Sequence, residues 1–155
     1  SGIVHSERYE RLRRDGGTMH GLQILIALPD AEEDRPPSFA HHSAESLPKL
    51  QALGVSGTLL AGSLDGHVSP VRVMSPLYLA DVTLAEGAQL AAPEGVTDRA
   101  AYVVSGEVSC DGLTAGDGST LVFAPGAEAT VFANRPTRLV WLGGEPVGTR
   151  FLWWN

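Results

Sequence analysis

Cysteine and long apolar runs are scarce in this sequence of 155 residues. The single cysteine, Cys110, excludes an internal disulfide framework and is typical of a protein kept in a reducing compartment. No apolar run approaches the roughly 20 residues that a membrane-spanning helix needs. We therefore expect an intracellular, cytoplasmic protein that does not associate with a membrane.

Lysine is almost absent, and acidic residues outnumber basic ones. The chain has 11 basic and 18 acidic residues, which gives a formal net charge of −7. The densest basic group comprises Arg8, Arg11, Arg13 and Arg14, and it is interleaved with Glu7, Glu10 and Asp15. Binding to a nucleic acid depends on clustered cations that neutralise phosphates. The charge pattern therefore argues against direct nucleic-acid binding and predicts a solvated segment for the basic group.

Several motifs that define common enzymes and binding proteins are missing. The chain contains no GxGxxG, no P-loop and no CxxC pair, so nothing supports a site for a dinucleotide, a nucleotide or structural zinc. It also lacks the nucleophile elbow of the α/β-hydrolases. Hydrolase chemistry of that kind is therefore not predicted.

Glycine and proline, by contrast, are plentiful and regularly placed. The 18 glycines and 10 prolines separate short apolar stretches, which is typical of short strands joined by turns. No segment keeps the periodicity of a long helix. We therefore predict an all-β protein, a sandwich or small barrel. The expected strands cover residues 57–61, 68–73, 77–84, 101–104, 107–110, 119–123, 129–132 and 138–142.

Pairs of aspartate and glycine mark two of the expected turns. Asp65-Gly66 and Asp111-Gly112 are typical of two-residue hairpin loops. Cys110 directly precedes the second pair, so we interpret it as a thiol beside a turn and not as a reactive group.

Three segments carry more specific predictions. In residues 77–84 the apolar side chains alternate, so one set should face the core; that set is Tyr78, Ala80, Val82 and Leu84. Residues 21–28 form a continuous apolar run of strand length, for which we predict a buried strand. Residues 29–48 are rich in proline and charge, and we interpret them as a connection between domains.

The opening of the sequence resembles the pirin family. Residues 1–7 read SGIVHSE and residues 20–24 read HGLQI, and the family pattern is GI-x-HSE, a short loop, then HGLQ and an apolar strand that ends in LP. The strand would end here at Leu28-Pro29. The likeness continues in order through Pro37-Ser38-Phe39 with His41 and His42, Ser69-Pro70-Val71, Gly143-Gly144-Glu145-Pro146 and Trp153-Trp154-Asn155.

Pirins are bicupins, with two β-barrels in tandem and iron or a similar divalent metal in the N-terminal barrel. The resemblance thus implies a cupin fold, the double-stranded β-helix or jelly-roll barrel. Residues 46–155 would form one complete C-terminal cupin domain, and residues 1–45 would be remnant strands of the N-terminal cupin and a linker. The family's HPHRGFE segment and its C-terminal helix are missing here, so the resemblance implies a fragment of such a protein.

His5 and Glu7 are the candidate metal ligands. They are two residues apart, so on a strand both side chains project from one face. An imidazole nitrogen and a carboxylate oxygen suit Fe(II) or another divalent transition metal. Taken alone, this triplet is typical of a surface or a turn. The resemblance implies that both residues are metal ligands in the intact protein, where Glu7 would be a ligand or a catalytic proton acceptor.

This chain by itself offers only those two ligands. Two protein ligands rarely hold a transition metal against solvent, so we expect a weak site or no bound metal in the chain as written. In the C-terminal barrel, no histidine stands at the general cupin ligand positions, which correspond to residues 90–94 and 129–130. The resemblance therefore implies that this barrel is metal-free.

The remaining histidines have other expected roles. His20 precedes the apolar run, and we expect a structural hydrogen bond, with a contact near the metal or direct ligation as alternatives. His41 and His42 would project to opposite faces of an extended segment, which suits a linker and not a shared ion. His67 lies beside a turn and should be solvated.

Two functions follow from the resemblance. The first is a metal-dependent dioxygenase of the quercetinase type, an oxidoreductase whose substrate would be a flavonol-like small molecule; the fragment itself would be inactive. The alternative is a metal-linked regulatory or protein-binding module, of the transcription co-regulator kind, without catalysis. Because residues 1–28 would lack partner strands in this chain, we also expect a homo-oligomer or association with the missing N-terminal segment.

Overall fold

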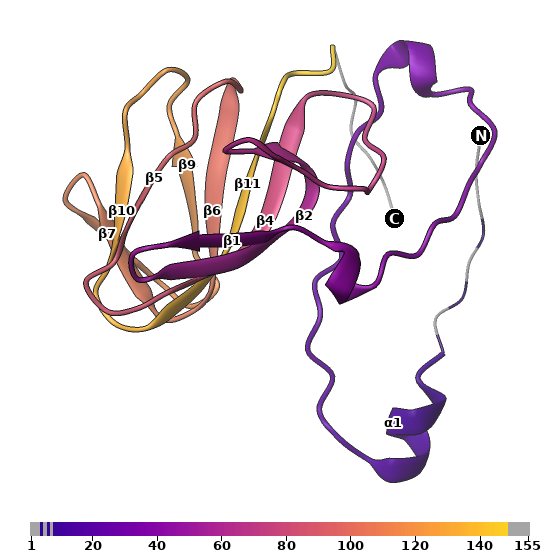
Figure 1. Ribbon diagram of the computed structural model, residues 1–155, viewed down its shortest axis with the longest axis horizontal. Coiled ribbons are helices and arrows are strands. Elements are labelled where there is room, and N and C mark those ends of the chain that lie inside the picture. Colours follow the sequence, from indigo (N-terminus) through magenta and orange to yellow (C-terminus); the bar gives the residue numbers. More distant parts are fainter. Residues whose placement is uncertain (1–3, 5, 7, 149–155) are drawn as a thin grey trace.

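Eleven β-strands account for most of the regular structure in the part of the chain that the computed structural model describes, which is residues 4, 6 and 8–148 (Figure 1). They are β1 (Lys49–Ala52), β2 (Val55–Leu64), β3 (His67–Val68), β4 (Leu77–Leu84), β5 (Gln89–Ala91), β6 (Asp98–Ser105), β7 (Glu107–Cys110), β8 (Leu113–Gly116), β9 (Thr120–Phe123), β10 (Thr130–Ala133) and β11 (Thr137–Gly144). Three short helical segments precede them: α1 (Glu10–Asp15), η1 (Asp30–Glu32) and η2 (Ala44–Ser46). None of these helices is long and apolar enough to cross a membrane.

The strands form two antiparallel sheets. The larger sheet has the order β1-β2-β4-β11-β6-β9, with β3 paired to β2, and the smaller has the order β5-β10-β7-β8. Strands that are neighbours in space are often distant in sequence, because β11 lies between β4 and β6. This order requires crossovers between the two sheets, as in a jelly roll. The prediction of an all-β cupin barrel is therefore confirmed.

The core lies between the two sheets and is filled by alternate side chains. The predicted inward set of β4 is confirmed, since Tyr78, Ala80, Val82 and Leu84 are at most 2% exposed. Among the described residues, the largest fully buried side chain is that of Trp141 on β11, and its ring centroid lies 5.6 Å from that of Phe123. Because successive side chains point to opposite faces of a strand, every second side chain of each central strand packs in the core.

Two hairpin turns form where the Asp-Gly pairs predict them. Asp65 and Gly66 have φ angles of 49° and 78°, and Asp111 and Gly112 have 49° and 77°. Positive φ at both central residues is the conformation that matches the twist of two adjoining strands. The first turn joins β2 to β3, and the second joins β7 to β8. Cys110 ends β7 as a buried thiol, and burial raises its pKa, so the thiolate form is disfavoured.

The predicted buried strand over residues 21–28 is wrong. No strand forms there, and the side chains of Leu22 and Leu25 are 51% and 66% exposed. The reason is that the described part of the chain offers this run no neighbouring strand with which to pair. It lies instead along the outer face of the larger sheet, in the segment of residues 8–35 that runs outside the barrel and is called the arm below (Figure 1).

The connection expected at residues 29–48 is irregular apart from η1 and η2. The division of the chain at residue 45 stays a prediction.

Truncation of Trp141 tests this account of the core. We expect Trp141→Ala to lower the free energy of unfolding by about 3–5 kcal/mol, because it removes the largest side chain between the sheets. Val122→Ala is the control, since Val122 is 79% exposed on β9 and should change stability by less than about 0.5 kcal/mol. Urea unfolding followed by fluorescence or circular dichroism measures both. Equal effects of the two substitutions would contradict this packing.

Candidate functional site

The two candidate metal ligands, His5 and Glu7, lie outside the described residues, so their assignment stays a prediction. Within residues 4, 6 and 8–148, no group of three or more His, Cys, Asp or Glu side chains is placed to hold a metal ion. The described residues alone therefore do not fit a transition metal.

The other histidines are scattered over the surface. His20 is exposed and lines a small hollow of about 190 Å³ above Asp81 and Arg138, which form an ion pair with Nη2 of the arginine bound to a carboxylate oxygen at 2.6 Å. His41 is exposed in the connection, and His42 beside it is half-buried. His67 is exposed in β3, as expected for a solvated side chain.

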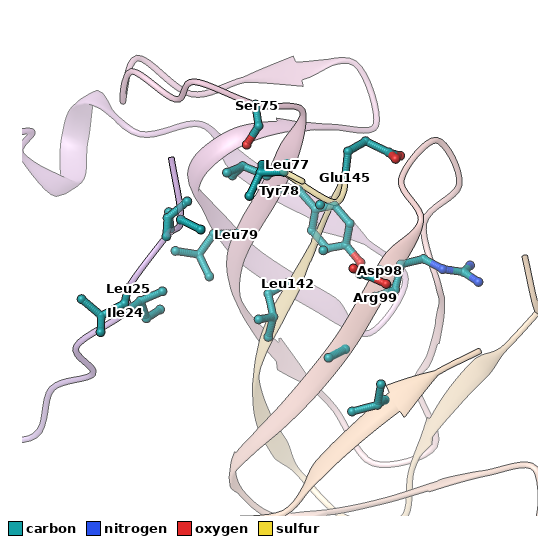
Figure 2. A pocket seen from close by; sticks show the side chains of 17 residues that line it. Ile24, Leu25, Ser75, Leu77, Tyr78, Leu79, Asp98, Arg99, Leu142 and Glu145 are labelled. Atoms are coloured by element: carbon teal, nitrogen blue, oxygen red, sulfur yellow. The ribbon is translucent and has the colours of Figure 1, made fainter. Parts of the chain in front are cut away.

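An apolar groove of about 360 Å³ lies beside the larger sheet and is shown in Figure 2. One wall is the arm segment 24–27, and the floor is the outer face of β4, β11, β6 and β9. The floor is formed by outward-facing side chains that alternate with the core set, among them Leu77, Leu79, Ala100, Val122 and Leu142. At this groove both faces of the sheet are therefore apolar, whereas Asp81 and Arg138 form an ion pair elsewhere on the outer face.

Tyr78 lies at the polar end of the groove. Its hydroxyl is buried and has no hydrogen-bond partner among the described residues. Burial raises the pKa of Tyr78 to about 12, and the nearby charge of Arg99 opposes this effect. The ring occupies space left by Gly143 on the adjacent strand, where a Cβ would come within 2.6 Å of the ring atom Cε1. Glycine is thus required at 143 for Tyr78 to keep this position.

Arg99 carries a buried positive charge. Among the described residues, the hydrogen bonds of its guanidinium go to backbone carbonyl oxygens. Its guanidinium donates from Nη2 to the carbonyl oxygens of Ala124 and Ala127 at 3.1 and 2.8 Å, and from Nη1 to that of Pro93 at 3.4 Å. None of the ion pairs among the described residues involves Arg99. The three bonds fasten β6 to the β5–β6 and β9–β10 loops, so Arg99 acts as a structural tie at one end of the barrel.

Glu145 makes a second tie at the same end of the molecule. Its two carboxylate oxygens accept hydrogen bonds from the backbone N–H and the side-chain hydroxyl of Thr97, at 2.9 and 2.8 Å. Charge-assisted bonds of this kind are among the stronger ones in proteins. Hydrogen bonds of Arg99 and Glu145 therefore hold the loops at the rim of the groove, while its floor is apolar. The arrangement suits an apolar occupant and offers no evident acid–base pair.

Sequence reasoning did not single out Tyr78, Arg99 and Gly143 as a group. Arg99 did carry a signal, since it stands at an inward position of an otherwise apolar alternating strand, two residues before Ala101. What the sequence could not give is the pairing of β4 and β6 on either side of β11, which places Tyr78 and Arg99 opposite the same residue, Gly143.

The fold defines the protein as a cupin, and comparison with known proteins narrows the class. Residues 79–155 match the pirin C-terminal cupin domain. A pirin-like protein from Caulobacter vibrioides is 42% identical over 156 residues, which cover 100% of this chain and 54% of that protein. The chain belongs to the pirin family.

Two further relatives carry the name of an activity. A Pseudomonas aeruginosa protein provisionally named quercetin 2,3-dioxygenase is 33% identical over 176 residues, covering 99% of this chain and 48% of its own length. A crystal structure of quercetin 2,3-dioxygenase from Acinetobacter baumannii superposes with a TM-score of 0.73 at 27% identity, over 84% of this chain and 44% of that one. The chain thus spans about half the length of the relatives it matches.

The raised pKa of Tyr78 predicts a loss of stability in alkali. Between pH about 10 and about 12 the phenol of the unfolded chain is deprotonated while the folded one keeps its proton, so stability should be complete below pH 10 and fall as the pH rises through this window. Tyr78→Phe should remove that part of the fall and leave stability at pH 7 unchanged or slightly higher, because it deletes an unpartnered buried hydroxyl. Urea unfolding at pH 7, 9 and 11 measures the effect. Parallel pH profiles of the two proteins would disprove it.

Proposed function

We propose that this chain is part of a metal-dependent oxidoreductase of the quercetin 2,3-dioxygenase type. The observation that carries the proposal is the identity of 33% to the Pseudomonas protein of that name over 99% of this chain. The Acinetobacter quercetin 2,3-dioxygenase supports it, because its structure shares the fold over 84% of this chain. The relatives named above that state an activity state this one, so it is preferred to a regulatory role without catalysis.

In the proposed enzyme, His5 and Glu7 would supply two of the metal ligands. A bound Fe(II) or similar ion would polarise the oxygen atoms of a flavonol-like substrate and support oxygen chemistry. The residues of this chain would contribute an imidazole nitrogen, a carboxylate and, from Glu7, a group that can hold a proton. The remaining ligands would come from the part of the longer relatives that this chain does not span.

The described barrel would serve this site as a scaffold. Its core is closed between two sheets, and Arg99 and Glu145 tie its loops at the end of the groove. The outer face of β4, β11 and β6 carries the segment 24–27, which follows residues 5 and 7 in the sequence. A rigid element behind a metal site keeps its ligands within the narrow tolerance that catalysis needs.

A chimera tests this proposal directly. In the Caulobacter pirin-like protein, the matched 156 residues are replaced by this chain, which is possible because the match covers all of it. We expect about one metal ion per chain by elemental analysis and oxygen uptake when quercetin is added. His5→Ala and Glu7→Gln should each lower the rate at least about 100-fold, because the loss of a ligand exceeds the 10–100-fold cost of losing a supporting residue.

His67→Ala is the matched control, since this histidine is exposed in β3 and the proposal gives it no role. It should leave metal content and rate unchanged. If the chimera binds metal and quercetin causes no oxygen uptake, the proposed activity is wrong. If either ligand variant retains a full complement of metal, the ligand assignment is wrong.

A further inference from the structure

Arg99 places a permanent positive charge inside the barrel. It is an inward-facing residue of β6, and the next residues on the same face of that strand are Ala101 and Val103. Its side chain belongs to a residue that is only 5% exposed, and a guanidinium keeps its proton at any pH at which proteins fold. Buried charges normally have a partner of opposite sign. Among the described residues, no salt bridge involves Arg99, and its Nε atom has no hydrogen-bond partner.

The carbonyl oxygens that Arg99 contacts come from two loops at one end of the barrel. Pro93 lies in the loop of residues 92–97, between β5 and β6. Ala124 and Ala127 lie in the loop of residues 124–129, between β9 and β10. Figure 2 shows the guanidinium pointing away from the apolar groove. One buried cation therefore binds oxygen atoms of both loops at once.

These loops include the positions that correspond to metal ligands in other cupins, residues 90–94 and 129–130. The two stretches lie side by side, because the backbone N–H of Ala92 donates to the carbonyl oxygen of Ala129 at 2.8 Å. Both alanines pack against the core, and an alanine side chain cannot bind a metal. Their small size also leaves room on the inner side for a long side chain from the opposite sheet. The residues at this end of the barrel therefore do not fit a metal ion, and they adjoin a guanidinium instead.

We propose that the guanidinium of Arg99 takes the place of a metal ion in this barrel: it joins the two loops through their oxygen atoms, and its charge excludes a divalent cation. A bound metal stabilises a fold by drawing ligands from separate segments to one positive centre. A guanidinium can do the same with carbonyl oxygens, because it presents five N–H donors in a rigid planar fork. Burial weakens the screening of its charge, so a second cation near the loops is repelled. The inference concerns residues 90–143 and is independent of the proposed activity.

Arg99→Met tests the joining of the loops. It removes all three hydrogen bonds to the carbonyl oxygens, so we expect amide hydrogen exchange in residues 92–97 and 124–129 to become at least about tenfold faster. Hydrogen exchange followed by mass spectrometry measures this. Arg138→Met is the matched control, because it makes the same change at an exposed ion pair on the outer face and should leave exchange in both loops unchanged.

An introduced pair of histidines tests the exclusion of metal. Ala92→His and Ala129→His are combined in a His5→Ala background, which removes a candidate ligand of the proposed enzyme from the measurement. With Arg99 in place, calorimetric titration should show Ni²⁺ binding no tighter than in the His5→Ala chain alone. Adding Arg99→Met should tighten Ni²⁺ binding at least about tenfold, because the repelling charge is gone. Adding Arg99→Glu should tighten it at least about 100-fold, because a carboxylate ligand replaces that charge.

Three results would overturn the proposal. Exchange in both loops could stay as slow in Arg99→Met as in the unchanged chain, or the histidine pair could bind Ni²⁺ equally well with and without Arg99. The third is tight Ni²⁺ binding by the histidine pair while Arg99 is present, which needs no substitution of the arginine.

Arg99→Gln replaces Arg99→Met in both tests if circular dichroism shows that the methionine variant is unfolded. Glutamine is neutral and keeps N–H donors, so it should tighten Ni²⁺ binding while changing loop exchange less. Oxygen uptake by the chimera does not enter these measurements, so the proposed activity and this inference can fail separately.

Discussion

The alternation of side chains along β4, β11 and β6 is the constraint on which the rest of this structure depends. Each of these strands gives one set of side chains to the core, where Trp141 and its neighbours are almost completely buried. The other set must face outward; it is apolar where these strands line the groove, and it includes the ion pair of Asp81 and Arg138 elsewhere. A strand that is apolar on both faces is typical of a sheet covered on both sides. The barrel therefore folds around one face of the sheet and presents an apolar groove on part of the other.

The arm covers part of that outer face. It crosses the outer face close enough for Val140, an outward residue of β11, to be buried, yet its own Leu22 and Leu25 remain exposed. Uncovered apolar surface costs about 25 cal/mol per Å², so a few hundred Å² matter against the small net stability of a domain. The chain spans about half the length of the relatives it matches, so the exposed part of this surface is described here only for residues 4, 6 and 8–148.

Long central strands were predictable because their core residues repeat at a fixed period. The stretch 77–84 was predicted at the bounds that β4 has, and its inward set was correct. The short strands β1, β5 and β8 were missed, because each has three or four residues with at most one buried side chain and so shows little periodicity. The expected strand 68–73 is reduced to β3, since the side-chain hydroxyl of Ser69 bonds to the carbonyl oxygen of Leu60 and Pro70 cannot donate to a ladder.

By itself, the sequence determined the all-β class, the hairpins at Asp65-Gly66 and Asp111-Gly112, and membership of the pirin family, whose motif includes His5 and Glu7. Each of these depends on local chemistry: the period of a strand, the φ angles that a turn requires, or a short motif. Only the tertiary structure decided that residues 21–28 lie unpaired on the outer face, and that Tyr78 and Arg99 meet across Gly143. Those outcomes depend on which distant strands become neighbours, and an apolar run has the same sequence whether or not a partner strand is present to pair with it.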